Sequence, residues 1–196
     1  MSSTNLFYTI VDGDKYLSLL VLDGEGILLY ASLGTSQASL VQLMMKDFRS
    51  IKGYRLNSFS SASSKILSDK SRSLLVKNIE LFKGLMSDSP SSKSKIKYKF
   101  IFGTQLQRKV WTHLVDNVPF GEVTNYSTVA KDLNKSASSS RAIGNCIGSN
   151  KLAIIVPCHR VLGSKGTLNG YRYGVSVKRM LLRAELGDNF GKYVKS

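Results

Sequence analysis

The chain has 196 residues, of which 42% are hydrophobic and 21% are charged, and its formal net charge is +15. This length provides for one domain or two small ones, and two cysteines with two histidines are too few for a cysteine-rich zinc fold. No apolar run approaches the roughly 20 residues of a membrane-spanning helix, and the N-terminus lacks the basic start and apolar stretch of a secretion signal. We therefore expect a nuclear protein in a eukaryote, or a cytoplasmic one otherwise, with free thiols rather than a disulfide.

The positive charge is concentrated in the second half of the sequence. Residues 1–92 contain 10 Lys and Arg against 8 Asp and Glu, a net charge of +2. Residues 93–196 contain 18 against 5, a net charge of +13. Such a basic surface favours a polyanion such as nucleic acid, although a basic face kept for solubility or an acidic protein partner would explain the charge equally well.

The first half of the sequence predicts three strands and two helices. The runs LFYTIVD, YLSLLVLD and GILLYASLG are separated by the turn signals GDK and GEG, a pattern typical of a three-stranded meander. Apolar side chains recur at helical spacing over residues 39–48, and a second helix is expected over residues 73–82. The serine-rich stretch 86–95 has the composition of a linker. We therefore place a domain boundary there, which gives domains at 1–92 and 93–196.

The second half is expected to be mainly helical. TQLQRKVWTHLVDNV carries an apolar residue at every fourth position, with Thr104 as its N-cap. NYSTVAKDLN predicts a short helix and SASSSRAIGNCIGSN another, so the two are similar to a helix-turn-helix, a pattern that any pair of short helices produces. LAIIVP is expected to form a short buried strand, and SVKRMLLRAEL a last helix.

Cys158 raises the question of chemistry. It lies in the sequence PCHR, at the end of the expected strand and next to His159. A free thiol in such a place is more often a core residue than a nucleophile. An adjacent imidazole, however, lowers the pKa of a thiol and so favours the reactive thiolate. From these residues alone, both interpretations remain open.

Four motifs follow one another in the second half: PFGEVTNY, SRAIGNCIGSN, IIVPCHRVLGS, and GYRYG with KRMLLRAE after it. In this order and spacing they closely resemble the O6-alkylguanine-DNA alkyltransferase family of direct-reversal DNA repair proteins, from about Phe100 to Gly187. The resemblance implies a two-domain α+β fold. An N-terminal ribonuclease H-like α/β domain would precede a mostly helical domain that carries a winged helix-turn-helix and the active-site cysteine.

The resemblance also implies the reaction. Cys158 would attack the alkyl carbon on O6 of guanine in double-stranded DNA, and guanine would leave. The product is a thioether, which offers water no electrophilic carbonyl, so each chain would react once and irreversibly.

Activity on O4-alkylthymine is left open, and a monomer without membrane contact is expected. Some family members bind zinc through N-terminal Cys and His. Residues 1–92 contain neither, so we expect no metal and no cofactor.

Four neighbours of Cys158 receive roles from the same resemblance. His159 resembles the histidine that takes the cysteine proton through a water molecule, and Glu185 resembles the carboxylate that holds this histidine. Asn150 resembles the asparagine whose turn positions the cysteine. Tyr126 resembles the tyrosine that crowds a DNA phosphate and donates a proton to guanine N3. Without the resemblance, Glu185 would be interpreted as a surface carboxylate, Asn150 as a turn residue, and Tyr126 as a half-buried helix residue.

Contact with DNA is assigned to the helix that opens with Arg141. A buried thiol cannot reach a base inside a duplex, so the nucleotide must flip out. Arg141 resembles the finger that takes its place in the stack, although a phosphate-binding arginine is the plainer interpretation. The small residues Ala142, Gly144 and Gly148 would let this helix approach the minor groove, whose degenerate pattern gives little sequence preference.

A further group of residues is expected to form the guanine pocket. The loop NGYRYG resembles the pocket wall, and Ser164 is expected to contact O6 or a polar group nearby. The pocket residues implied by the resemblance are Val161, Tyr171, Arg172 and Tyr173. An aromatic ring at Tyr173 would narrow the pocket against bulky free-base inhibitors.

Two other functions are alternatives. A non-enzymatic, alkyltransferase-like protein would bind the lesion without accepting the alkyl group, but such relatives lack the acceptor cysteine that this chain keeps. A cysteine hydrolase would need turnover, and a redox enzyme would need a resolving cysteine. The candidate for the latter, Cys146, lies on the expected DNA-reading helix, where we interpret it as a packing residue.

Overall fold

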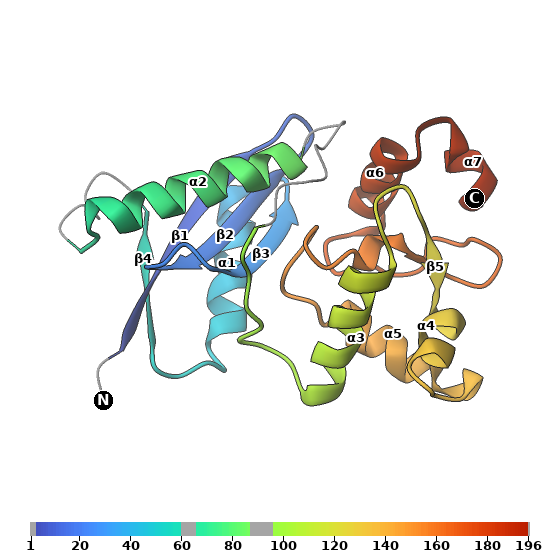
Figure 1. Cartoon of the computed structure of the whole chain (residues 1–196). Coiled ribbons are helices and arrows are strands. Elements are labelled where there is room, and N and C mark those ends of the chain that lie inside the picture. Colours follow the sequence, from blue (N-terminus) through green and yellow to red (C-terminus); the bar gives the residue numbers. More distant parts are fainter. Residues whose placement is uncertain (1–2, 60–65, 87–95, 196) are drawn as a thin grey trace. The chain divides into compact units, whose positions relative to one another are not determined.

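The computed structural model describes residues 3–59, 66–86 and 96–195, and the chain forms two compact units, Met1–Phe102 and Gly103–Ser196 (Figure 1). Helices accompany a four-stranded mixed sheet in the first unit, and helices predominate in the second. The expected α+β class is therefore confirmed. Among the described residues, none of the helices combines the length and the apolar character that crossing a bilayer requires.

The sheet of the first unit contains the expected meander and one further strand. Strands β1 (Thr4–Asp12), β2 (Leu17–Asp23) and β3 (Leu28–Gly34) pair antiparallel in sequence order, which confirms the predicted strands. The sequence does not predict β4 (Tyr54–Ser58), which pairs parallel to β1 and completes the order β3-β2-β1-β4. This edge strand has no fully buried residue, so it lacks the apolar pattern by which strands are found.

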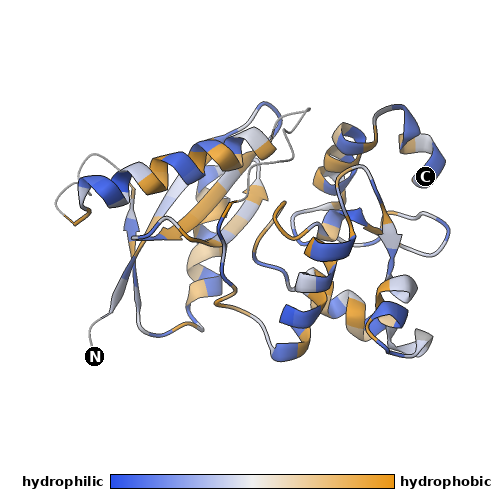
Figure 2. Cartoon of the chain, viewed as in Figure 1, coloured by the Kyte–Doolittle hydropathy of each residue, from blue (hydrophilic) through white to orange (hydrophobic). Residues whose placement is uncertain are grey.

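Two amphipathic helices contact this sheet, α1 (Gln37–Phe48) against β2 and β3 and α2 (Asp69–Leu85) against β1 (Figure 2). Both were expected. Each begins after a serine, Ser36 or Ser68, whose hydroxyl accepts a backbone N–H of the first turn. The cap at Ser68 starts α2 four residues before the predicted helix 73–82.

The first unit extends beyond the predicted domain boundary. That boundary, between residues 92 and 93, lies outside the described residues. The segment after it belongs to the sheet: the N–H of Leu28 donates to Lys97 O, and the N–H of Lys99 donates to Leu28 O. Phe102 is buried in the core of the first unit, among Leu6, Tyr30 and Phe48.

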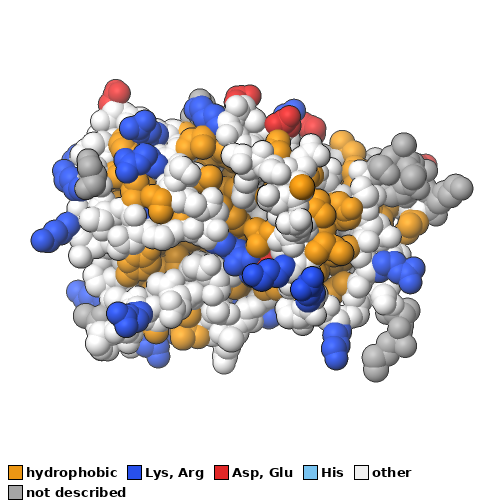
Figure 3. Space-filling view, turned by 180° about the vertical axis from the view of Figure 1, so that it is seen from behind, with side chains coloured by type: hydrophobic (Ala, Val, Ile, Leu, Met, Phe, Trp, Pro, Cys, Tyr) orange, Lys and Arg blue, Asp and Glu red, His pale blue; other side chains and the backbone are white. Residues whose placement is uncertain are grey.

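The charge asymmetry between the two units is smaller than the predicted boundary suggests. Met1–Phe102 contains 14 Lys and Arg against 8 Asp and Glu, a net charge of +6, and Gly103–Ser196 contains 14 against 5, a net charge of +9. Both units are therefore basic. On the face shown in Figure 3, lysine and arginine side chains are scattered widely, whereas acidic side chains gather near the upper edge.

The second unit is a set of helices with one short pair of parallel strands, β5 (Thr124–Asn125) and β6 (Val161–Leu162). Its helices, including three one-turn 3₁₀ helices, are α3 (Gln105–Asn117), α4 (Tyr126–Asp132), η2 (Ala137–Ser139), α5 (Ser140–Gly148), η3 (Cys158–Arg160), α6 (Val175–Leu186), η4 (Gly187–Asn189) and α7 (Phe190–Tyr193). The expected helices are all present. Thr104 caps α3 in a reciprocal capping box with Gln107.

The predicted buried strand LAIIVP, residues 152–157, is wrong. These residues form successive turns, in which the N–H of Ile155 donates to Ala153 O and the N–H of Val156 donates to Leu152 O. Ile154 has a φ of 69°, which interrupts any extended run. The segment is largely buried, as expected, because a short apolar run indicates burial without distinguishing a strand from a turn.

Helix α5 is held on the rest of the second unit by α3 and α4. It packs against both, and the indole N–H of Trp111 on α3 donates to Cys146 O at 2.7 Å. Cys146 itself is buried, as are Ile143 and Ile147 on the same face. The opposite face of α5, which includes Arg141 and Ala142, is exposed.

Candidate active site

Cys158 opens the 3₁₀ helix η3, directly after the buried turns and Pro157, and its side chain is buried. The amide of Asn150 reaches it: Nδ2 donates to the Cys158 Sγ at 3.3 Å and to Leu152 O at 3.2 Å. The Oδ1 of Asn150 accepts the N–H of Leu152 at 2.8 Å. One buried side chain therefore ties the turn segment to the thiol.

His159, the next residue, belongs to a buried charge network. Its Nε2 lies 2.8 Å from Oε1 of Glu185 on α6. Arg160 holds the same carboxylate with two bonds, Nε to Oε2 at 2.7 Å and Nη2 to Oε1 at 3.0 Å. A third bond, from Nη1 to Val118 O at 2.7 Å, fixes the guanidinium to the end of α3. Arg160 therefore positions the Glu185 carboxylate, and the carboxylate in turn positions the imidazole of His159.

The pKa values of this network define its charges near neutral pH. Burial alone would raise the pKa of Glu185, but the charges and hydrogen bonds of His159 and Arg160 lower it to about 2. Burial lowers the pKa of His159, and the Glu185 charge offsets this only in part. The carboxylate is therefore ionised and the imidazole neutral. A carboxylate only accepts, so Nε2 of His159 donates and Nδ1 is the basic nitrogen.

The basic nitrogen of His159 has room for a proton. Nδ1 is buried and has no hydrogen-bond partner among the described residues. A buried polar atom of this kind costs free energy unless it is paired. Placed one residue from a thiol, it is suited to accept a proton.

Three side chains act on the pKa of the Cys158 thiol. Burial raises its pKa, whereas the hydrogen bond from Asn150, the charge of Lys178 and a hydrogen bond from Tyr171 act to lower it. Tyr126 is also within electrostatic reach, because burial and then the Cys158 charge raise the pKa of its hydroxyl. At rest the sulfur is thus a protonated thiol within a set of groups that favour its ionisation.

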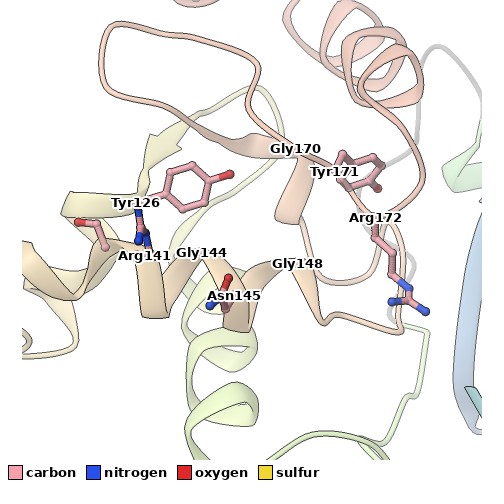
Figure 4. Close-up of a pocket in the computed structure, with 9 residues that line it drawn as sticks. Tyr126, Arg141, Gly144, Asn145, Gly148, Gly170, Tyr171 and Arg172 are labelled. Carbon is pink, nitrogen blue, oxygen red and sulfur yellow. The ribbon is translucent and has the colours of Figure 1, made fainter.

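A pocket of about 500 Å³ opens beside α5 in the second unit (Figure 4). Tyr126 and Arg141 stand at one end of it, and Tyr171 and Arg172 at the other, with Gly144 and Gly148 between them. The remaining lining residues are Ser140, Asn145 and Gly170. This volume is within the range of small-molecule sites.

Three other residues expected at the pocket, Val161, Tyr173 and Ser164, are not among its lining residues. Val161 is buried on β6, and the hydroxyl of Tyr173, also buried, donates to Asn150 O at 3.4 Å. The rings of Tyr171 and Tyr173 meet edge to face with centroids 5.3 Å apart. Ser164 is exposed in a turn and is not among the lining residues, so its contact with a base stays a prediction.

The sequence motifs do not predict the roles of two residues of the site. Arg160 belongs to the motif PCHR, but the motif does not indicate that its guanidinium binds Glu185. Lys178 on α6 is completely buried, and its Nζ donates to Val161 O at 2.6 Å and to Asn169 O at 3.0 Å. Its signal in the sequence is position: Leu181 and Leu182 follow at three and four residues, which places Lys178 on the apolar face of the helix.

No group of three or more potential metal ligands is found among His, Cys, Asp and Glu in the part of the chain that the structure describes. The site itself contains one cysteine, one histidine and one carboxylate, and the carboxylate is already occupied by His159 and Arg160.

The chain is similar to known proteins in both sequence and fold. Residues 105–187 match the family model described as 6-O-methylguanine DNA methyltransferase, DNA binding domain. A protein of Scheffersomyces stipitis named methylated-DNA–protein-cysteine methyltransferase is 47% identical, over 97% of this chain and 98% of that protein. A protein of Candida albicans with the same name is 43% identical, over 93% and 97%. The crystal structure of the O6-methylguanine methyltransferase of Mycobacterium tuberculosis superposes with a TM-score of 0.66 at 23% identity, over 92% and 93%, which shows a common fold.

Proposed function

The chain belongs to the methylated-DNA–protein-cysteine methyltransferase family, and from this premise we propose that Cys158 is the cysteine that accepts the alkyl group. The protein performs direct-reversal DNA repair by alkyl transfer to a cysteine. The chain has two cysteines, both free. Cys146 lies on the buried face of α5, whereas Cys158 has a base beside it and an amide on its sulfur. This arrangement is the observation that carries the proposal.

The mechanism begins with proton transfer from the thiol. Nδ1 of His159 takes the proton through a bound water molecule, and the ionised Glu185 stabilises the imidazolium that forms. Arg160 keeps the carboxylate oriented while the charge on His159 changes. The roles are those of a nucleophile, a base and a group that orients the base.

Alkyl transfer follows as a single displacement. The sulfur forms a bond to the alkyl carbon, the bond from that carbon to O6 breaks, and its electron pair leaves with guanine. The Tyr126 hydroxyl, which retains its proton because its pKa is raised, donates toward guanine N3. In the balance, one proton leaves the thiol and one reaches the base. The thioether that remains does not hydrolyse, so each chain acts once.

The duplex is engaged through the second unit. We propose that α4, η2 and α5 form a winged helix-turn-helix with α5 in the minor groove, supported by the packing of α4 on α5 and by the exposed Arg141 at the start of α5. Arg141 fills the gap left by the flipped nucleotide, and the base enters the pocket between Tyr126 and Tyr171. O6-alkylguanine in double-stranded DNA is the substrate, and O4-alkylthymine is not assigned.

We also propose that the protein acts as a monomer, that its first unit is ribonuclease H-like, and that it is located in the nucleus. All site residues belong to one unit of one chain, which supports action as a monomer. The strand order β3-β2-β1-β4, with β4 parallel to β1, supports a ribonuclease H-like first unit. The substrate is genomic DNA and the relatives named above are yeast proteins, which supports a nuclear location.

The Cys158→Ser variant tests the proposal. The serine hydroxyl is a much weaker nucleophile than the cysteine thiol and occupies nearly the same volume. Methyl transfer from a duplex with O6-methylguanine should therefore be abolished. Binding to that duplex should persist, because it depends on other residues. Cys146→Ser is the matched control and should still transfer the methyl group. Transfer that survives in Cys158→Ser but is lost in Cys146→Ser would move the acceptor to α5.

A further inference from the structure

Lys178 is a buried lysine for which the mechanism above has no role. We propose that its ammonium group is the counter-ion of the Cys158 thiolate, the charge that stabilises the sulfur once His159 has taken the proton. The inference rests on the proposed function, in which Cys158 must ionise to react. Lys178 then acts as a positioning and electrostatic residue and does not itself exchange a proton with the substrate.

The surroundings of Lys178 lack an anion of their own. Lysine is almost never fully buried unless it is paired, and Lys178 is 0% exposed. Its two hydrogen-bond acceptors, Val161 O and Asn169 O, are neutral carbonyls and use two of its three N–H groups. No carboxylate pairs with Lys178 among the described residues. The cost of burying this charge is therefore offset only in part while Cys158 carries its proton.

Other ionisable groups near the thiol are engaged elsewhere or neutral. They are His159 and Arg160 on η3, Glu185 on α6, Tyr126 on α4, and Tyr171 in the loop before α6. The Glu185 carboxylate is balanced by the Arg160 guanidinium at 2.7 Å. His159 is neutral near pH 7 because burial lowers its pKa, and Tyr126 keeps its proton because burial raises its pKa. Among these groups of the described chain, Lys178 therefore carries a buried charge without an anionic partner, and ionisation of Cys158 supplies that partner.

The charge on Lys178 is present under physiological conditions. Burial lowers the pKa of Lys178 to about 8, against an opposing influence of the Cys158 charge. The lysine therefore remains mostly protonated at pH 7. Reciprocally, the Lys178 charge acts to lower the pKa of the Cys158 thiol. The two groups stabilise each other's charged forms, which is the expected behaviour of an ion pair.

The position of Lys178 also explains why the charge stays in place. Val161 lies three residues after Cys158, and Asn169 begins the loop that carries Tyr171. The bonds at 2.6 and 3.0 Å therefore attach the ammonium to the segment of the nucleophile and to the pocket wall. A purely structural role for Lys178 would use these two bonds alone and would need no positive charge.

The substitution Lys178→Gln separates charge from hydrogen bonding. Glutamine keeps N–H donors for the two carbonyls and removes the charge, whereas Lys178→Arg keeps the charge. Arg183→Met, on the exposed side of the same helix, removes one positive charge away from the site and is the matched control. The readout is carbon-13 NMR of labelled cysteine, in which the Cβ shift reports ionisation without any reagent. The chain has two cysteines, and Cys158→Ser assigns the two signals.

We expect the Cys158 signal to titrate at a higher pH in Lys178→Gln than in the native protein, and at an unchanged pH in Arg183→Met. Lys178→Arg should stay close to the native protein. At pH 7, alkylation of Lys178→Gln by free O6-benzylguanine should be roughly tenfold slower or more. A native titration midpoint in Lys178→Gln would overturn the inference and leave a structural role.

The reverse experiment requires no substitution at Lys178. Coupling between two sites is reciprocal, so removing the sulfur must affect the lysine. In Cys158→Ser, the Lys178 Cε signal should titrate at a lower pH than in the native protein, and an unchanged midpoint would contradict the ion pair. These titrations are independent of alkyl transfer. A failure of the proposed function would appear separately, as transfer that persists in Cys158→Ser.

Discussion

Arg160 donates a hydrogen bond to each carboxylate oxygen of Glu185, with Nε 2.7 Å from Oε2 and Nη2 3.0 Å from Oε1. Oε1, the oxygen that Arg160 shares with His159, lies 2.8 Å from Nε2 of the imidazole. Paired, planar contacts of this kind are specific to arginine, because a lysine ammonium is a point charge without the fork. The residue after Cys158 and His159 thus holds the carboxylate that His159 contacts.

Arg160→Lys should therefore slow the reaction while keeping the charge. Loss of a hydrogen bond to a charged group costs about 1.5–3 kcal/mol, which corresponds to roughly ten- to a hundredfold in rate. The slowing should be similar for duplex substrate and for free O6-benzylguanine, since the defect lies in the base. Single-turnover rates measure it, with Arg183→Lys as control. Native rates in Arg160→Lys would show that His159 is oriented without the fork.

The Glu185 network should also govern stability in acid. Its pKa is about 2 in the folded protein against an ordinary value of 4.5, so the unfolded chain binds more protons between these values. The contribution of Glu185 to stability is therefore complete above pH 4.5 and is lost as the pH drops toward 2, by about 3 kcal/mol in total.

Denaturant unfolding of the native protein and Glu185→Gln tests this prediction. The difference in unfolding free energy should be largest near pH 6 and should shrink steadily below pH 4.5. Asp188→Asn, which removes an exposed carboxylate, provides the comparison. A difference between native protein and Glu185→Gln that stays constant down to pH 3 would exclude a strongly lowered pKa.

Duplex DNA and free O6-benzylguanine should distinguish the role of Arg141 from that of Tyr126. Extruding a paired base costs a few kcal/mol, so Arg141→Ala should slow repair of duplex DNA by roughly ten- to a thousandfold. Free O6-benzylguanine needs no flipping, and its rate should hardly change. Tyr126→Phe should slow both reactions, because it removes the proton donor to the leaving base. Equal slowing of both substrates in Arg141→Ala would assign Arg141 to the chemistry or the fold instead.

Gly148 tests the approach of α5 to DNA. A Cβ added at this position would meet no atom within 4 Å beyond the adjacent residues and the helix's own backbone, so we expect the fold to accept Gly148→Leu. If α5 enters a groove, the new side chain should weaken binding of undamaged duplex by roughly tenfold, or 1.4 kcal/mol. Gly84→Leu, on α2 and equally open, is the control. Equal duplex affinities of the two variants would place DNA away from the end of α5.

Much of the fold follows from local patterns in the sequence. The meander is encoded by three apolar runs with turn signals between them, and α3 by the capping box of Thr104 and Gln107. The missed strand β4 is short and half-exposed, and it pairs with β1 across about 50 residues of sequence. The predicted strand 152–157 fails because apolar composition specifies burial but not the backbone angle of Ile154.

The site was less accessible to sequence reasoning than the fold. Cys158 and His159 are adjacent, so their pairing could be inferred, but their contact with Glu185 spans 26 residues and was known only through the family motif. Lys178 illustrates the limit more sharply. A charged residue in a helix usually indicates a solvated face, so the spacing of Lys178 from Leu181 and Leu182 is a weak signal, and the structure shows that its ammonium is buried and bonded to Val161 O.

The most direct measurement is mass spectrometry of the protein after incubation with a duplex that contains O6-methylguanine. With lesions in excess, we expect a gain of one methyl group per chain, carried by the peptide that contains Cys158, and no further repair once every chain has reacted. A methyl group on another peptide, or clearance of several lesions by each chain, would contradict it.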